Sequence, residues 1–263
     1  MSKGFLWFAQ NNDKTDYVKC SIELAKSIKK HNSENTICVV TDEKSKFESE
    51  HVDIVKVMNT DESASHELKW ANEYKAFRFS PFTHTIKLES DMLWTANTDW
   101  WWYHLWQHDL VFSVDCKNYV DATVKNTSYR KLFVKNNLPN IYNGLTYFRR
   151  SVPAQNFFAL CGMISKNWQE VKSTMLVDCH DEYPSTDVVY ALAYRITDPT
   201  NKKLIDYEWF KFIHNKVDIQ GHSTKYLLPF AIDEKIIYGS QRLHRPWHYF
   251  EKHIPEEMNA RVF

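Results

Sequence analysis

Residues 4–12 read GFLWFAQNN, in which six small or apolar residues lead into three amide side chains. A short apolar run that ends in polar residues predicts a buried strand followed by a loop. A helix should then begin at Thr15 or Asp16, either of which can cap it, and continue for about four turns. Two more strands are predicted next, over residues 36–41 and 52–57. This β-α-β-β order predicts an α/β fold in which helices flank a mostly parallel central sheet.

The alternation of strands and helices continues to about residue 200. Apolar runs bounded by polar residues predict strands over residues 85–88, 110–114 and 145–148. Helical spacing predicts helices over residues 68–79, from Asp99 through a Trp-rich segment, over 154–165 and over 187–194. The remaining C-terminal residues are less periodic and favour no particular element.

The composition is that of one globular domain. Hydrophobic residues make up 43% of the 263, enough for a sizeable core, and no Pro/Gly/Ser-rich linker or repeat divides the chain. We therefore expect a single domain over residues 1–263. The N-terminal apolar run is too short for a signal peptide, and no apolar run is long enough for a membrane span. Five cysteines without a C-x-x-C pair favour reduced thiols in the cytoplasm and argue against structural zinc.

Glycine-rich phosphate loops are absent from the sequence. The chain has 5 glycines and contains no G-x-G-x-x-G, P-loop or G-x-S-x-G motif. These absences exclude Rossmann dehydrogenases and P-loop kinases.

Polar residues follow the predicted strands at the positions where ligands bind in parallel sheets. Gln10 and Asn11 follow the first strand, and Asp42 follows the second. Ligands of open α/β sheets bind outside the carboxyl ends of the strands, so these side chains are candidates for donor binding. Lys75 and Arg78, three residues apart on a predicted helix, could hold donor phosphates, although a solvated face explains Arg78 equally well.

The segment Glu89-Ser90-Asp91 comes directly after an apolar strand. Carboxylates two residues apart on an extended chain point the same way, and paired hard oxygen ligands suit Mg²⁺ or Mn²⁺. Such an ion would neutralise charge on a nucleotide diphosphate. The alternative is a solvent-exposed turn.

A longer stretch around this segment carries a family resemblance. Residues 70–82 (WANEYKAFRFSPF) and 85–93 (TIKLESDML) resemble the heart of GT-A glycosyltransferases, most nearly the glycogenin-like group and small tailed-bacteriophage relatives. Residues 142–148 (YNGLTYF) resemble the strand that lines the sugar pocket. Residues 185–189 (STDVV) resemble a helix start whose acidic residue faces the donor sugar, and residues 244–249 (HRPWHY) a segment that supplies a histidine to the metal. The first acidic residue is Glu here, where the family has Asp.

The resemblance implies a GT-A fold and a role for each matching residue. Residues 1–115 would form the nucleotide-sugar-binding half and residues 116–263 the acceptor-binding half. The metal would be held by Glu89, Asp91 and His244, with His248 as the alternative histidine. The donor sugar would be lined by Asn143, Gly144 and Asp187, although Asp187 is equally suited to cap its helix. The nucleoside would be contacted by Gln10, Asn11 and Asp42.

The resemblance implies transfer of a sugar from a UDP-sugar, with retention of configuration as in the glycogenin-like group. Residues 116–150 carry seven basic side chains and one acidic one. With the phage resemblance, this block suggests 5-hydroxymethylcytosine in phage DNA as the acceptor, in the host cytoplasm. DNA phosphates would be contacted by Lys117, Lys125, Arg130, Lys131 and Lys135. A carbohydrate or protein acceptor, a non-catalytic nucleotide-sugar-binding module and a merely solvated basic surface remain alternatives.

Overall fold

Alternating side chains of β1 (Lys3–Ala9) establish the two faces of the central sheet. Leu6 and Phe8 belong to the apolar cluster on one face, whereas Phe5 and Trp7 belong to the cluster on the other. Successive side chains of a strand point to opposite faces, so an all-apolar strand requires cover on both.

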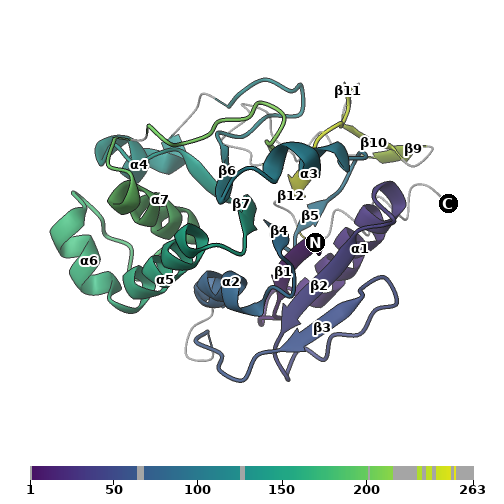
Figure 1. The fold of residues 1–263 in the computed structure, drawn as a ribbon, viewed down its shortest axis with the longest axis horizontal. Coiled ribbons are helices and arrows are strands. Elements are labelled where there is room, and N and C mark those ends of the chain that lie inside the picture. The colour runs from purple at the N-terminus through teal and green to yellow at the C-terminus, as the bar shows by residue number, and fades with distance from the viewer. Residues whose placement is uncertain are drawn as a thin grey trace.

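The computed structural model describes residues 2–63, 68–124, 128–200, 202–215, 230–232, 235–238, 241–249 and 252. Six of its strands form the central sheet, in the order β3-β2-β1-β4-β7-β6 (Figure 1). The other five are β2 (Thr36–Thr41), β3 (Ile54–Val57), β4 (His84–Leu88), β6 (Leu110–Val114) and β7 (Ile141–Arg149). Strands β3, β2, β1 and β4 pair in parallel, and β7 runs antiparallel to both β4 and β6. Five of the six strands therefore point the same way, which confirms the predicted mostly parallel sheet.

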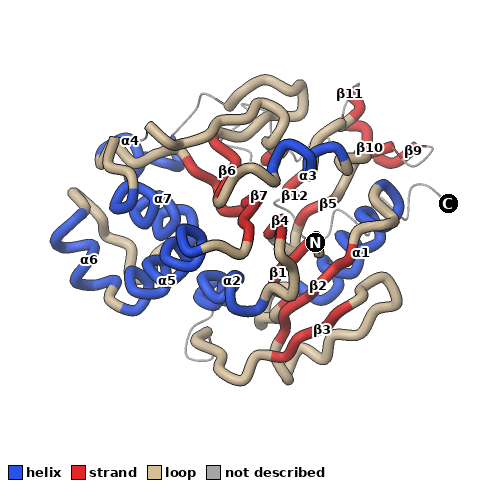
Figure 2. The backbone as a smooth tube through the Cα atoms, in the orientation of Figure 1, coloured by secondary structure: helices blue, strands red, loops and turns tan. Residues whose placement is uncertain are grey.

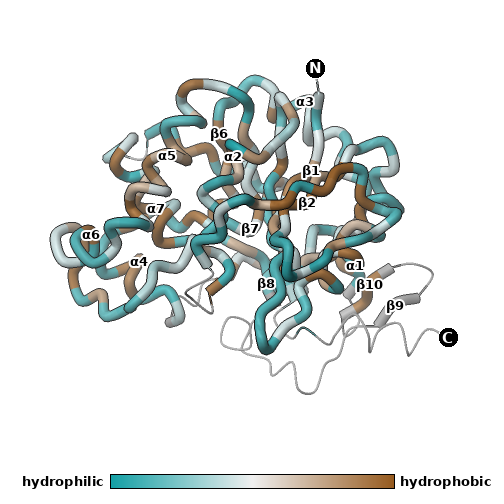
Figure 3. Tube along the Cα trace, turned by 90° about the horizontal axis from the view of Figure 1, so that it is seen from below, coloured by the Kyte–Doolittle hydropathy of each residue, from teal (hydrophilic) through white to brown (hydrophobic). Residues whose placement is uncertain are grey.

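Helices cover both faces of this sheet, as Figure 2 shows. On one face lie α1 (Tyr17–His31) and α3 (Trp100–Leu105), and on the other α5 (Val152–Lys166) and α7 (Thr186–Thr197). In Figure 3 the hydrophobic stretches of β1 and β2 run through the middle of the molecule. The shorter helical segments are η1 (Lys69–Lys75), α2 (Ala76–Phe79), η2 (Ser128–Arg130), α4 (Lys131–Lys135) and α6 (Trp168–Met175). The predicted flanked α/β fold is confirmed.

Some helix ends were predicted correctly from the local sequence, and others were not. The Asp16 carboxylate accepts the Lys19 amide at 3.0 Å, which confirms the predicted cap of α1. The predicted helix over residues 68–79 is instead the 3₁₀ helix η1 followed by the short α2. At α7 the cap is Ser185 and not Asp187, which leaves the Asp187 carboxylate available for other contacts. The separate helix α6 was not predicted.

Two small sheets complete the described part of the chain. One joins β9 (Phe230–Ile232), β10 (Lys235–Tyr238) and β11 (Gln241–Arg242). The other joins β5 (Met92–Leu93), β12 (Trp247–Tyr249) and β8 (Ile213–Asn215). Because β5 begins immediately after Asp91, the pairing of β12 with β5 brings the C-terminal segment to the acidic motif.

All five cysteines are free thiols, and four of them are buried. Among the described residues, no helix has both the length and the apolar character needed to cross a membrane.

Candidate functional site

Glu89, Asp91 and His248 form a compact group at the carboxyl end of β4. The His248 Nε2 atom lies 3.1 Å from Asp91 Oδ2 and 3.4 Å from Glu89 Oε2. One potential ligand atom from each residue lies within 4.8 Å of the others. Two carboxylate oxygens and an imidazole nitrogen are groups that bind divalent cations in proteins. The residues present therefore fit a divalent cation.

The histidine in this group is His248 and not His244. The strand β12 places His248 opposite Met92 and His214, next to the acidic motif. His244 precedes the strand, is exposed, and lines a separate surface hollow with Trp100. The prediction that His244 joins the carboxylates is thus corrected to His248.

Opposite charges crowd around Asp91. Burial raises the pKa of the Asp91 carboxyl, but the charges of His248 and Lys252 outweigh burial and lower it well below its usual range. Lys252 places its ammonium directly on Asp91 Oδ2. Burial lowers the pKa of His248, but the charges of Asp91 and Glu89 outweigh that effect and raise it. His248 and Lys252 thus both lie against the carboxylate of Asp91.

This group borders a hollow of about 260 Å³ at the carboxyl ends of β1 and β4, where parallel sheets bind their ligands. We call it the donor hollow, and it is lined by Phe8, Gln10, Asn12, Tyr17, Lys69, Trp70, Glu73, Glu89, Ser90, Asp91, His214, His248 and Lys252. Lys69, Glu73, His214 and Lys252 were not singled out from the sequence, because no local motif marks them.

Of the predicted nucleoside contacts, only Gln10 lines the donor hollow. Its amide donates to Asp42 Oδ2 at 2.9 Å, and Asp42 in turn accepts the Ser45 amide at 2.7 Å. Burial raises the pKa of Asp42, but hydrogen bonds from Gln10 and Ser45 outweigh burial and lower it. The Asn11 side chain accepts the Val18 amide at 2.9 Å, which ties the loop to α1. Asn11 and Asp42 thus hold the loops that position Gln10.

The structure does not bring Lys75 or Arg78 to the donor hollow. Lys75 is buried and donates to Thr60 O at 2.7 Å and to Asn72 Oδ1 at 2.8 Å. Arg78 is exposed beside Phe79. The two cations therefore do not share one exposed face, because Lys75 is buried and Arg78 is exposed.

Behind Glu89 runs a buried polar chain that begins at Lys87. The Lys87 ammonium contacts the Glu73 carboxylate and donates to Asn143 Oδ1 at 2.5 Å. An ammonium has no acceptor, so this contact fixes the orientation of the Asn143 amide. Its nitrogen then donates to Glu89 Oε1 at 3.0 Å and to Asp187 Oδ1 at 3.2 Å.

The chain continues to Asp187 and ends at Arg130. Asp187 Oδ1 accepts the backbone amide of Asn143 at 2.8 Å, and Oδ2 accepts Arg130 NH1 at 2.7 Å. Neither Asn143 nor Asp187 lines the donor hollow. The structure thus brings both predicted sugar-site residues to the site, as supports of Glu89.

Gly144 is required for this close approach. A Cβ atom at Gly144 would lie 2.9 Å from Glu89 Oε2 and 3.4 Å from Phe212 Cζ. Any side chain there would displace Glu89 from its position beside β7.

Two cations of the basic block over residues 116–150, Lys117 and Arg130, are buried. Arg130 is 3% exposed, with its guanidinium 3.6 Å from the Phe133 ring centroid. Lys117 is also buried and pairs with Glu208 at 2.5 Å. Lys131 and Lys135 are exposed, and Lys135 pairs with Asp178. Lys125 lies outside the described residues. The predicted phosphate contacts of Arg130 and Lys117 are therefore wrong, because both cations are buried and each is already paired with a carboxylate, Asp187 and Glu208 respectively.

No protein-family model matches the chain, and no curated protein matches it. Among solved structures, it is similar to the galactosyltransferase LgtC in complex with donor and acceptor sugar analogs. The identity is 15%, the TM-score 0.47, and the similarity covers 72% of this chain and 70% of that one. We therefore infer the function from the geometry of the site.

Proposed function

We propose that the protein is a metal-dependent glycosyltransferase that uses a nucleotide diphosphate sugar, with UDP as the nucleotide. The observation that carries the proposal is the group of Glu89, Asp91 and His248 inside the donor hollow. The family resemblance of the segment around Asp91 supports the same reading. Both carboxylates come from residues 1–115, and the histidine comes from residues 116–263.

A divalent ion held here, Mn²⁺ or Mg²⁺, would supply Lewis-acid neutralisation of the diphosphate leaving group. The protein's own residues do the positioning. Asn143 and Asp187 hold Glu89 in place, and Gln10 lies where the nucleoside would enter. Lys69 and Lys252 provide the cations that a diphosphate needs.

The proposed transfer needs no catalytic base from the protein. The bond between the anomeric carbon and the β-phosphate oxygen breaks, and a bond to an acceptor hydroxyl oxygen forms. The proton of that hydroxyl passes to the departing phosphate. This route retains the anomeric configuration, as the glycogenin-like resemblance implies.

The test is release of UDP from a panel of UDP-sugars with Mn²⁺, together with direct Mn²⁺ titration. The Asp91→Asn variant should bind Mn²⁺ at least about tenfold more weakly than the unaltered protein. It should also lose UDP release. Asp13→Asn, an exposed carboxylate near the same loop, is the matched control and should change neither. Full UDP release by Asp91→Asn would refute the proposal. UDP binding without turnover of any donor would favour the non-catalytic module.

A further inference from the structure

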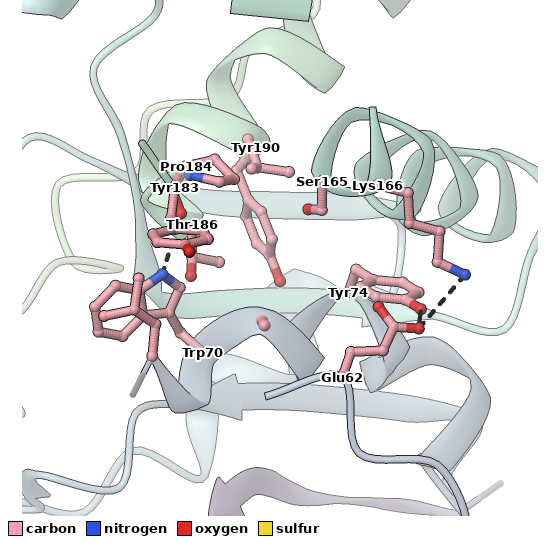
Figure 4. A pocket seen from close by; sticks show the side chains of 12 residues that line it. Glu62, Trp70, Tyr74, Ser165, Lys166, Tyr183, Pro184, Thr186 and Tyr190 are labelled. Carbon is pink, nitrogen blue, oxygen red and sulfur yellow. Dashed lines mark hydrogen bonds and ion pairs between the residues drawn. The ribbon is translucent and has the colours of Figure 1, made fainter. Parts of the chain in front are cut away.

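A second hollow, of about 250 Å³, lies between η1 and the helices α5 and α7 (Figure 4). We call it the aromatic hollow, because Trp70, Tyr74, Tyr183 and Tyr190 line it. Trp70 lines the donor hollow as well, so the two hollows meet at this side chain. Its indole nitrogen donates to Pro184 O at 3.1 Å, which fixes the ring while leaving it 40% exposed.

The Tyr190 hydroxyl is the group in the aromatic hollow that a ligand would bind. Tyr190 is completely buried, and its hydroxyl has no hydrogen-bond partner among the described residues. Figure 4 shows its side chain reaching from α7 into the middle of the aromatic hollow. A buried hydroxyl without a partner costs stability that Phe at the same position would avoid. A ligand hydroxyl in the hollow would supply the missing partner.

The charges of the hollow favour a neutral ligand. Lys166 lies 3.4 Å from Glu62 Oε1, and the Tyr74 hydroxyl also contacts that carboxylate. Lys166 is the one cation among the lining residues, and its charge is already balanced. A polyanion such as DNA would find no unbalanced cation there among the described residues.

Aromatic walls with a few polar groups suit a ring that has apolar faces and hydroxyl edges. We propose that the aromatic hollow binds a neutral carbohydrate, and that this carbohydrate is the acceptor. The assignment of this carbohydrate as the acceptor rests on the proposed function, because the aromatic hollow adjoins the donor hollow at Trp70. A pyranose would stack on the aromatic rings and place a hydroxyl on Tyr190.

The test uses the full-length protein and three neutral disaccharides: maltose, cellobiose and N,N′-diacetylchitobiose. Binding is measured by saturation-transfer NMR at roughly 10 mM sugar, where millimolar affinities are visible. Tyr190→Phe should weaken sugar binding about three- to tenfold, which corresponds to the loss of one hydrogen bond. In the absence of sugar the same variant should be at least as stable to heat as the unaltered protein, and its Mn²⁺ affinity should not change. Tyr103→Phe, at an exposed ring on α3, is the matched control and should change nothing.

Activity separates this proposal from the proposed function. The bound disaccharide should raise UDP release, and Tyr190→Phe should raise the KM for the sugar, whereas the control Tyr103→Phe should leave both the KM and sugar-independent UDP release unchanged. Sugar binding that depends on Tyr190 in a protein without donor turnover would keep the carbohydrate site and refute the glycosyltransferase. No saturation transfer to any of the three sugars, or UDP release stimulated only by DNA containing 5-hydroxymethylcytosine, would overturn the carbohydrate site.

Discussion

Replacing Lys87 by Met tests the buried polar chain behind the site. Lys87 is fully buried and contacts Glu73, whose side chain is also largely buried. Burial raises the pKa of Glu73 from 4.5 to about 7, although the ammonium of Lys87 opposes the rise. Removal of one partner of a buried ion pair costs about 3–5 kcal/mol when the other stays charged. At pH 6, below the pKa of Glu73, most of this carboxyl is already protonated, so the expected cost there is that of leaving Asn143 Oδ1 without its donor, about 1–3 kcal/mol.

The pH dependence follows from the sign of the Glu73 shift. A raised pKa in the folded state gives stability that is present below pH 4.5 and is lost as pH rises through the folded pKa. In the natural protein this loss ends near pH 7. Without the ammonium the Glu73 pKa rises further, and the loss continues above pH 7. The cost of Lys87→Met should therefore grow by about 1.4 kcal/mol between pH 7 and pH 8.

The assay is urea unfolding followed by tryptophan fluorescence at pH 6, 7 and 8. The double variant Glu73→Gln/Lys87→Met removes both charges. Its cost in free energy of unfolding should therefore not increase above pH 7. Lys26→Met, at an exposed pair with Glu23, should cost less than about 1 kcal/mol at every pH. A cost of Lys87→Met that is equal at pH 6 and pH 8 would refute the reasoning, as would a double variant that keeps the growth.

Three further predictions concern the site and its supports. Mn²⁺ affinity should fall about tenfold per pH unit below the pKa of His248, because a proton competes with the metal for the imidazole; burial lowers that pKa, but the two neighbouring carboxylates outweigh burial and raise it. An Mn²⁺ titration that gives equal affinity at pH 5.5 and pH 7.5 would contradict this. Arg130→Met should cost about 3 kcal/mol in thermal unfolding, since it strands a partly buried carboxylate, whereas exposed Lys131→Met should stay within about 0.5 kcal/mol. Equal costs for the two variants would place Arg130 on the surface. Asp16→Ala should cost about 1 kcal/mol through loss of the α1 cap, and Asp13→Ala much less, as chemical denaturation would show.

The parts of the fold that depend on short-range periodicity were predictable. The predictions of β1 from its apolar run and of the α1 cap were correct, because burial and capping act within a few residues. The position of Glu89 and Asp91 at a strand end was also predictable, since the predicted strand over residues 85–88 matches β4, which ends at Leu88. The 3₁₀ form of η1 was not, because helical spacing does not separate a 3₁₀ helix from an α-helix over two turns.

The roles of cations were misread wherever burial depended on partners far along the chain. Arg130 belongs to a basic stretch, and its sequence neighbours suggest a solvated surface. Its partner Asp187 lies 57 residues away, and only packing of η2 against α7 and β7 buries both. The amide of Asn143 is held between Lys87 and Glu89, which lie 56 and 54 residues away along the chain. Hydrogen-bond partners of this kind have no signature in local sequence.

By itself, the sequence determined the order of strands and helices, the mostly parallel sheet and the acidic pair at the end of β4. These features follow from apolar patterns whose period is set by local backbone geometry. Only the tertiary structure decided that His248, and not His244, joins the acidic pair. Both histidines flank the same Pro-Trp segment, but the pairing of β12 with β5 carries one to the carboxylates and leaves the other exposed. That choice depends on contacts between residues about 150 positions apart, which no local pattern encodes.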